Sequence, residues 1–333
     1  LQPPLAGHVI MGLDPGYRTG CKMAIIDAQG NVLDYGAYYL TNSEKLKQEA
    51  QKKLAEKIRK FNVTLLSIGN GTASYETEQF ASKMIEEEKL DCHYIITNEA
   101  GASVYSASKL AIDELPDLDV TIRGAVSIAR RVQDPLAESV KIDPKSIGVG
   151  QYQHDVNQKQ LTHTLDQVVE SVVNHVGVEL NTASPAILQH IAGISGTVAK
   201  NIVAFRQENG GFTSRKQLLK VPRLGPAAFT QCAGFLRLNG AKNPLDNTSV
   251  HPESYELAER IIGELGFTLK DLQDKSQLEA LQVKLPLVDV DKMAHKLDAG
   301  IPTVRDIIAA LAKPGRDPRE DLPAPLTRKH VVS

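Results

Sequence analysis

The stretch VIMGLDPGYRTGCKMAIIDAQGNVLDYG near the start of the chain constrains the fold most, because it sets strands and turns in a fixed order. An apolar run ending at Leu13 predicts a buried strand, and Asp14 stands where that strand ends. A proline and glycines then turn the chain into a second strand at Met23–Ile26, and Gly30 marks a hairpin into a third. This meander predicts a sheet with one carboxylate, Asp14, at the end of its first strand.

Strands and helices alternate after the meander. Ser43 is expected to cap a long helix, and a fourth strand, VTLLSIGNG, ends at Gly69. A second helix over Glu76–Lys89, a fifth strand in CHYIITNE and a third helix broken by Pro135 follow. The pattern predicts an α/β domain with a mixed sheet over residues 1–140.

The rest of the chain is predicted to be helical, because apolar residues there recur at helical spacing and strand patterns disappear. The tail KPGRDPREDLPAPLTRKH is rich in proline and charge, which is typical of a linker. The chain begins at Leu1 without Met, so we expect it to be part of a longer protein. The expected parts are a connecting helix at 141–180, a tandem helix-hairpin-helix domain at 181–240, a second small helical, hairpin-like domain at 241–312 and a linker at 313–333.

Composition sets limits on function. Lysine and arginine number 38 against 40 acidic residues among 333, so any contact with nucleic acid must be local. The three cysteines, Cys21, Cys92 and Cys232, lie far apart without metal-binding spacing, which predicts reduced thiols in the cytoplasm. No apolar run approaches the length of about 20 residues that spans a bilayer. We expect no membrane contact, metal or cofactor.

The most specific motif is a helix, a short hairpin and a second helix, which occurs twice in the helical half. Glycines in such hairpins let the backbone approach a phosphate, and the helix dipole favours the anion. This predicts sequence-independent binding of a DNA or RNA backbone, unless the hairpins serve only to pack helices. Ser195 stands where a second glycine is usual, and Arg223 replaces the first glycine of the second unit. The predicted contact residues are Gly193, Ile194, Ser195, Gly196 and Lys200 in the first unit and Arg223, Leu224 and Gly225 in the second.

The first domain resembles the RNase H-like fold, in particular its RuvC and YqgF branch. Nucleases of that fold need three or four carboxylates, because two metal ions must be held together. The resemblance implies acids on the first strand, at the end of the fourth strand and on a late helix. Here these positions hold Asp14, Asn70 and Arg123, with Glu99 after the fifth strand as another carboxylate. We therefore expect a catalytically silent domain in which these four positions are vestigial.

Two alternatives stay open for the acids. Asp14 could simply start a turn by accepting backbone hydrogen bonds. Alternatively, Asp14 and Glu99 could serve a metal-dependent, structure-selective nuclease or resolvase, with a third acid such as Asp134.

The order of motifs along the chain resembles the Tex family of bacterial transcription accessory proteins. After the YqgF-like region come VGQYQHDV, NTAS with the tandem hairpins, NPLDNTSVHPESY and RDIIAALAKPGRDPR. The resemblance implies a transcription-associated nucleic-acid-binding protein, with the transcription machinery as a partner. It also implies an N-terminal helical region and a C-terminal RNA-binding OB domain outside this chain. A further alternative is a scaffold that binds only proteins of that machinery.

Overall fold

The computed structural model describes residue 5 and residues 7–143 and 158–313. The chain divides between Thr162 and His163 into two compact units, the first α/β and the second helical. The motif VGQYQHDV and all but Lys313 of the predicted linker lie outside the described residues.

The first unit contains a five-stranded mixed sheet in the order β3-β2-β1-β4-β5. β1 pairs antiparallel with β2 and parallel with β4, so it lies at the centre of the sheet. The predicted fold class is confirmed here, including the meander and the parallel half. The strands are β1 Ile10–Asp14, β2 Cys21–Ile26, β3 Val32–Tyr38, β4 Leu65–Gly69 and β5 His93–Thr97.

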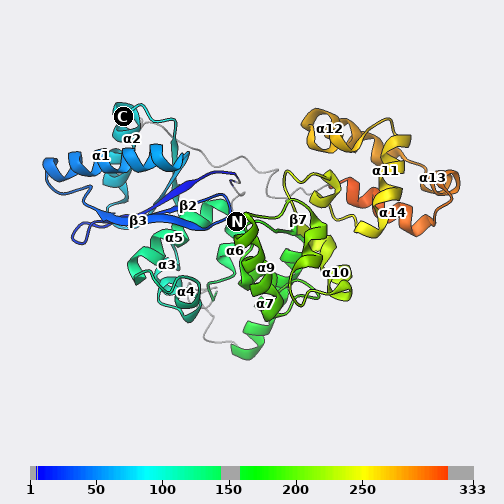
Figure 1. Ribbon diagram of the computed structural model, residues 1–333, viewed down its shortest axis with the longest axis horizontal. Helices are drawn as coiled ribbons and strands as arrows, with labels where there is room; N and C mark the ends of the chain where they lie inside the picture. The colour runs from blue at the N-terminus through cyan, green and yellow to red at the C-terminus, as the bar shows by residue number, and fades with distance from the viewer. Residues whose placement is uncertain (1–4, 6, 144–157, 314–333) are drawn as a thin grey trace. The chain divides into compact units, whose positions relative to one another are not determined.

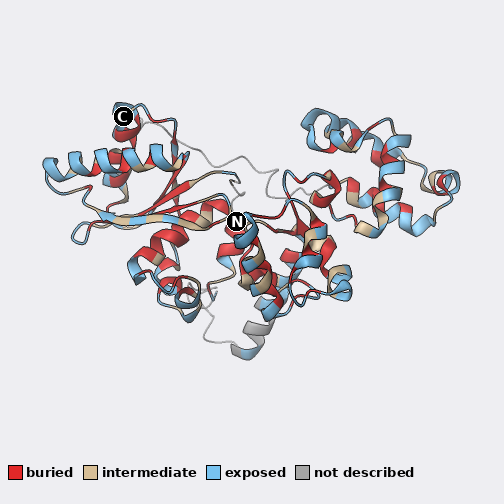
Figure 2. Ribbon diagram, viewed as in Figure 1, coloured by how far each residue is buried: buried red, intermediate tan, exposed pale blue. Residues whose placement is uncertain are grey.

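Helices cover both faces of this sheet (Figure 1). On one face, α1 Glu44–Phe61 and α2 Ser74–Glu87 pack over an apolar core that includes Leu13 and Leu54. On the other face, α5 Val120–Gln133 packs over a separate core. Gly12 of β1 permits that packing, because a Cβ there would overlap the carbonyl oxygen of Ala125. The central strand is thus buried on both sides (Figure 2).

Short helices that the sequence did not predict connect β5 to α5. They are α3 Ala102–Ser106 and α4 Lys109–Glu114, and α6 Pro135–Ser139 follows α5. A buried ion-pair network ties them together. Lys141 Nζ lies 2.8 Å from Glu138 Oε2 and 3.2 Å from Glu114 Oε2. Ser127 donates a 2.9 Å hydrogen bond to Glu138, whose pKa the neighbouring Lys141 lowers despite the opposing effect of burial.

The second unit is built from short helices, and the sequence boundary between the two units falls within α7 Gln158–Val176. Two two-residue strands, β6 Val178–Glu179 and β7 Leu236–Arg237, pair in parallel, which corrects the expectation that strands end before residue 141. The remaining elements are α8 Pro185–Leu188, α9 Gly196–Asn209, η3 Arg215–Lys220, α10 Pro226–Cys232, η4 Ala233–Phe235, η5 Pro244–Asn247, η6 Pro252–Ser254, α11 Tyr255–Glu264, η7 Leu269–Gln273, α12 Lys275–Lys284, η8 Leu285–Leu287, α13 Val290–Leu297 and α14 Ile301–Leu311.

Candidate nucleic-acid interface and candidate metal site

Asp14 is the last residue of β1. It is one of the two carboxylates that the nuclease alternative would use to bind a metal ion. It is opposite Lys22 in the pairing of β1 with β2. The pKa of Asp14 is raised to about 6, mainly by burial and also by the negative charge of Glu99, while the positive charge of Lys22 lowers it. The Asp14 and Glu99 carboxylates thus repel each other electrostatically.

The Glu99 carboxylate lies over the end of β4, where two glycines leave room for it. A Cβ on Gly69 or Gly71 would overlap the Glu99 carboxylate, so only glycine leaves room for it. Asn70 accepts a 3.2 Å hydrogen bond from the Glu99 backbone amide through its side-chain oxygen. The Glu99 Oε2 atom is buried and has no hydrogen-bond partner. Asn70 thus positions the loop that carries Glu99, in place of the acid that a nuclease would need there.

The residue of α5 that faces Asp14 is Gly124, which follows Arg123 in the sequence. A Cβ on Gly124 would lie 3.2 Å from Asp14 Oδ2. The Arg123 guanidinium donates 3.2 Å hydrogen bonds to the carbonyl oxygens of Leu115 and Ser106 instead. Neither Arg123 nor Gly124 therefore brings a carboxylate to Asp14.

The donors at this end of the sheet do not fit a two-metal site. Across residues 7–143 and 158–313, no group of three or more His, Cys, Asp or Glu side chains is arranged to hold a metal ion. Asp134, considered as a third acid, caps α6 by accepting a 3.1 Å hydrogen bond from the Ala137 amide. Two carboxylates remain, and two-metal catalysis needs more.

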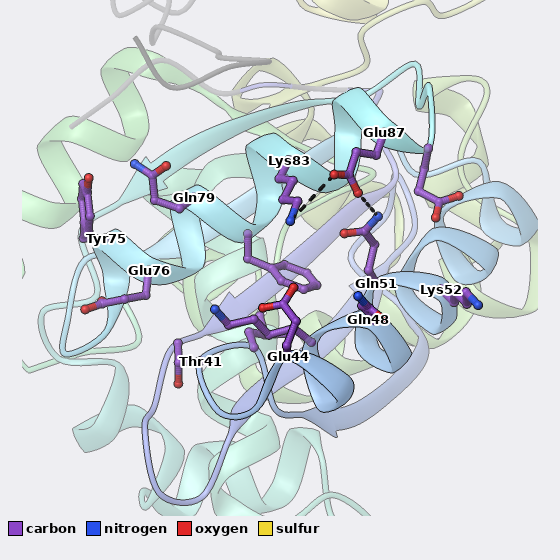
Figure 3. A pocket seen from close by; sticks show the side chains of 14 residues that line it. Thr41, Glu44, Gln48, Gln51, Lys52, Tyr75, Glu76, Gln79, Lys83 and Glu87 are labelled. Carbon is purple, nitrogen blue, oxygen red and sulfur yellow. Dashed lines mark hydrogen bonds and ion pairs between the residues drawn. The ribbon is translucent and has the colours of Figure 1, made fainter. Parts of the chain in front are cut away.

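A groove of about 560 Å³ lies between α1 and α2 on the other side of this unit (Figure 3). Glu87 accepts a 2.8 Å hydrogen bond from Gln51 and lies 3.8 Å from Lys83 Nζ. Glutamates and lysines alternate along the walls, so the groove favours neither anions nor cations. It therefore indicates no class of ligand.

The first hairpin of the second unit is a tight turn that leads directly into α9. The Ile194 amide donates to the Ile191 carbonyl at 3.2 Å, and Gly193 completes the turn at a φ of +84°. Ser195 caps α9 and accepts a 3.2 Å hydrogen bond from the Val198 amide. The first-turn amides of a helix have no partner within the helix, and Gly196 and Thr197 stand in that turn.

The second hairpin repeats this turn with an arginine. The Leu224 amide donates to the Val221 carbonyl at 3.1 Å, and Arg223 takes a φ of +65° where the first hairpin has Gly193. Gly225 then caps α10, with nothing within 4 Å of where its Cβ would lie. The exposed guanidinium of Arg223 therefore stands at the tip of the hairpin.

The two hairpins pack on each other's second helices. A Cβ on Gly193 would lie 2.8 Å from Gln231 Oε1 and 3.1 Å from the Ala228 carbonyl oxygen, both in α10. In return, Asn201 of α9 donates a 2.8 Å hydrogen bond to the Pro222 carbonyl in the second hairpin. The tandem hairpins are thus one structural body, and Gly193 is a packing residue as well as a turn residue.

Two of the eight predicted contact residues have buried apolar side chains. Ile194 is 6% exposed and Leu224 is 3% exposed, so both belong to the core. The side chains of Ser195, Lys200 and Arg223 are exposed, and Gly193 and Gly225 leave their backbone exposed. The alternation of apolar and glycine residues in the hairpins therefore reflects packing as well as ligand approach.

Arg215 is a buried residue that our sequence reasoning missed, because the run SRKQLLK is typical of a solvated surface. Its side chain is 1% exposed and donates to the carbonyl oxygens of Leu236 at 2.7 Å and Val250 at 2.9 Å. It also donates a 2.7 Å hydrogen bond to the Tyr255 hydroxyl. Arg215 thus joins the tandem hairpins to the helices that follow them.

Three family models match successive parts of the chain. Residues 8–133 match the Tex protein YqgF-like domain, residues 173–237 the helix-hairpin-helix motif and residues 243–319 the HHH domain. The last match overlaps the region 241–312, for which hairpin-like helices were predicted. None of the described helices has the length and apolar character needed to cross a membrane.

Similar proteins occur in bacteria and in animals. The chain is 50% identical to the transcriptional accessory protein Tex of Neisseria gonorrhoeae over 320 residues, 96% of this chain and 41% of that protein. It is 54% identical to protein YhgF of Escherichia coli K12 over 320 residues, 96% of this chain and 40% of that protein. It is 40% identical to the human S1 RNA-binding domain-containing protein 1 over 388 residues, 100% of this chain and 38% of that protein. The chain therefore spans less than half of these relatives, and over that span it belongs to the Tex family.

Proposed function

We propose that this chain binds the backbone of nucleic acids through its tandem hairpins, independently of sequence, as part of a transcription accessory protein of the cytoplasm. In this proposal the RNase H-like domain does not cleave. The name of the Tex relative supports the link to transcription, and the hairpin motif supports the nucleic-acid contact.

The charge of the tandem hairpins is the observation that carries the proposal. Residues 181–240 hold seven lysines and arginines and one acid, Glu208, although the whole chain is slightly acidic. Lys200, Lys216, Lys220 and Arg223 are exposed. Such a local cationic surface attracts phosphates, which carry no sequence information.

Binding isotherms of labelled single-stranded and duplex DNA and RNA, taken at several salt concentrations, test the proposal. We expect affinities of about 10⁻⁴ to 10⁻⁶ M that fall as salt rises. Gly196→Val and Gly225→Val should weaken binding to all sequences alike by about tenfold, because a side chain would block the approach of a phosphate. Neither position is crowded, since the nearest atom to a Cβ on Gly196 is 3.8 Å away.

Gly263→Val is the matched control. Gly263 lies in α11 with nothing within 4 Å of its Cβ position, so it tests a new side chain away from the hairpins. Thermal melts establish that each variant is folded. If folded Gly196→Val and Gly225→Val bind like the parent, the hairpins only pack and the proposal is wrong.

A single cation between Asp14 and Glu99 is the second candidate, because a buried Glu99 oxygen lacks a partner. It would give a metal-dependent nuclease only if another ligand completed the site. We expect branched, duplex and single-stranded substrates to survive long incubation with Mg²⁺ or Mn²⁺. Cleavage that is lost in Asp14→Asn would establish the nuclease in place of our proposal.

A further inference from the structure

The second hairpin domain carries the opposite charge to the first. Residues 243–312 hold twelve acidic residues against seven lysines and arginines. Residues 181–240 hold one acid against seven lysines and arginines. Two hairpin regions that follow each other in the sequence therefore carry net charges of opposite sign.

The residues that cap helix N-termini also differ in charge between the two domains. In the tandem hairpins, α9 is capped by Ser195 and α10 by Gly225, both neutral, and the capping box of η3 pairs Ser214 with Gln217. The equivalent box of η7 uses Asp271, which accepts a 2.8 Å hydrogen bond from the Thr268 amide.

Aspartates also cap the next helices of the second domain. Asp274 caps α12 and Asp289 caps α13, with 3.1 Å and 3.2 Å hydrogen bonds from backbone amides. In the last hairpin, Asp298 has a φ of +52°, in the same left-handed region as Arg223 in the tandem hairpins. Asp274 and Asp289 thus add negative charge at the N-termini of α12 and α13, and Asp298 adds it to the hairpin before α14, which is itself capped by the neutral Gly300. These charges repel a phosphate backbone.

An apolar patch lies on this acidic domain. Val283 is 70% exposed and Leu287 is 81% exposed, and Pro286 between them is also exposed. Lys284 does not cover the patch, because its Nζ donates to the Leu265 carbonyl at 3.2 Å and lies 5.1 Å from the centre of the Phe267 ring. We call Val283, Pro286 and Leu287 the apolar patch.

Exposed acids border the apolar patch at both ends. Glu279 is one helical turn before Val283 on α12, and residues four apart in a helix share a face. After Leu287 come Asp289 and Asp291, which are also exposed. Large exposed apolar side chains with a charged rim are typical of protein interaction sites.

We propose that the second hairpin domain is a docking module for a basic protein segment, which places an apolar anchor on the apolar patch and its lysines or arginines on the bordering acids. The charge of the domain excludes a nucleic-acid backbone as the occupant and selects a cationic one. The two hairpin domains then divide their roles, the first contacting nucleic acid and the second a protein.

Synthetic amphipathic peptides titrated into this chain at about 0.15 M salt test the proposal. A lysine–leucine peptide should bind, whereas a glutamate–leucine peptide of the same pattern and a lysine–serine peptide should bind at least about tenfold more weakly. The double variant Val283→Ser, Leu287→Ser should lose about tenfold in affinity for the lysine–leucine peptide. Glu279→Lys with Asp289→Ser, which keeps a capping residue, should have a similar effect.

Leu219→Ser is the matched control, because Leu219 is an apolar residue of the tandem hairpins that is 47% exposed. It should leave peptide binding unchanged. Equal binding of the glutamate–leucine peptide, or full binding by the folded double variant, would refute the proposal. So would loss of nucleic-acid binding in the double variant. Sedimentation that shows a dimer dissociating in the double variant would also refute it, because a second copy would then cover the patch.

Discussion

Arg223 shows how a single residue combines backbone strain with a ligand contact. Its φ of +65° lies in the left-handed region, which costs a side chain about 1 kcal/mol relative to glycine. In the first hairpin that position is Gly193, and the turn is otherwise the same. Strain of this kind is typical of functional positions, and here it places a guanidinium at the hairpin tip.

Replacement of Arg223 by glycine should separate the two effects. We expect a free energy of unfolding within about 1 kcal/mol of the parent, because relief of strain offsets the greater entropy of glycine in the unfolded chain. Affinity for nucleic acid should fall severalfold, and its dependence on salt should become less steep. Denaturant melts and binding isotherms measure both. A variant that binds as tightly as the parent would mean that Arg223 makes no phosphate contact.

Asp14 should make stability depend on pH. Its pKa is raised to about 6, so between about pH 4 and pH 6 the folded state holds a proton that the unfolded state releases. The free energy of unfolding contributed by this group is then fully present below pH 4 and is lost as the pH rises through 6. Asp14→Asn should therefore stabilise the protein by about 1 kcal/mol at pH 7 and leave it unchanged at pH 4. Melts across this range would contradict us if the difference were the same at every pH.

Among the elements, η3 depends on Arg215 for its connection to η5 and α11. The guanidinium satisfies several buried carbonyl oxygens at once, which a lysine cannot do. We expect Arg215→Lys to lower the free energy of unfolding by about 3 kcal/mol, and Arg215→Met by at least as much, because buried acceptors lose their donors. Lys216→Ala, at the exposed neighbour, should change it by less than about 0.5 kcal/mol. Equal melting of Arg215→Met and the parent would show that the carbonyl groups find other donors.

Elements with strong local signals were predictable from the sequence. Ser43 caps α1 as expected, because its hydroxyl accepts from the Leu46 amide. α2 begins at Ser74, two residues before the prediction, since Ala73 takes the left-handed conformation that starts it. α3 and α4 were missed because helices of one turn or two have no apolar periodicity to detect.

The candidate site was less predictable, because it depends on contacts between distant residues. A helix turns about 100° per residue, and the sequence alone placed the late-helix position only at Arg123 or Gly124, whereas the structure shows Gly124 facing Asp14. The unpartnered oxygen of Glu99 and the packing of Gly193 on α10 both depend on tertiary approach. The hairpin residues themselves were predictable, since their glycines and apolar residues follow a local pattern.

At the scale of the whole molecule, the chain has a net charge of only -2, although residues 181–240 are basic and residues 243–312 are acidic. The acidic helices should weaken nucleic-acid binding by the neighbouring hairpins at low salt. We expect Asp298→Asn, which asparagine tolerates at a positive φ, to raise affinity by about twofold at 0.05 M salt. At about 0.3 M salt the difference should vanish through screening. A difference that persists at high salt would show a direct contact of Asp298 with the ligand.

The buried guanidinium of Arg215 has a consequence for how two ligands would be held. The guanidinium donates to backbone carbonyl oxygens and stays protonated at any physiological pH. Neither a change of pH nor a substitution at the surface therefore removes these hydrogen bonds. The cationic hairpins and the apolar patch belong to the same compact unit. A protein bound at Val283 and Leu287 would then be carried by the same unit as a nucleic acid bound at the hairpins.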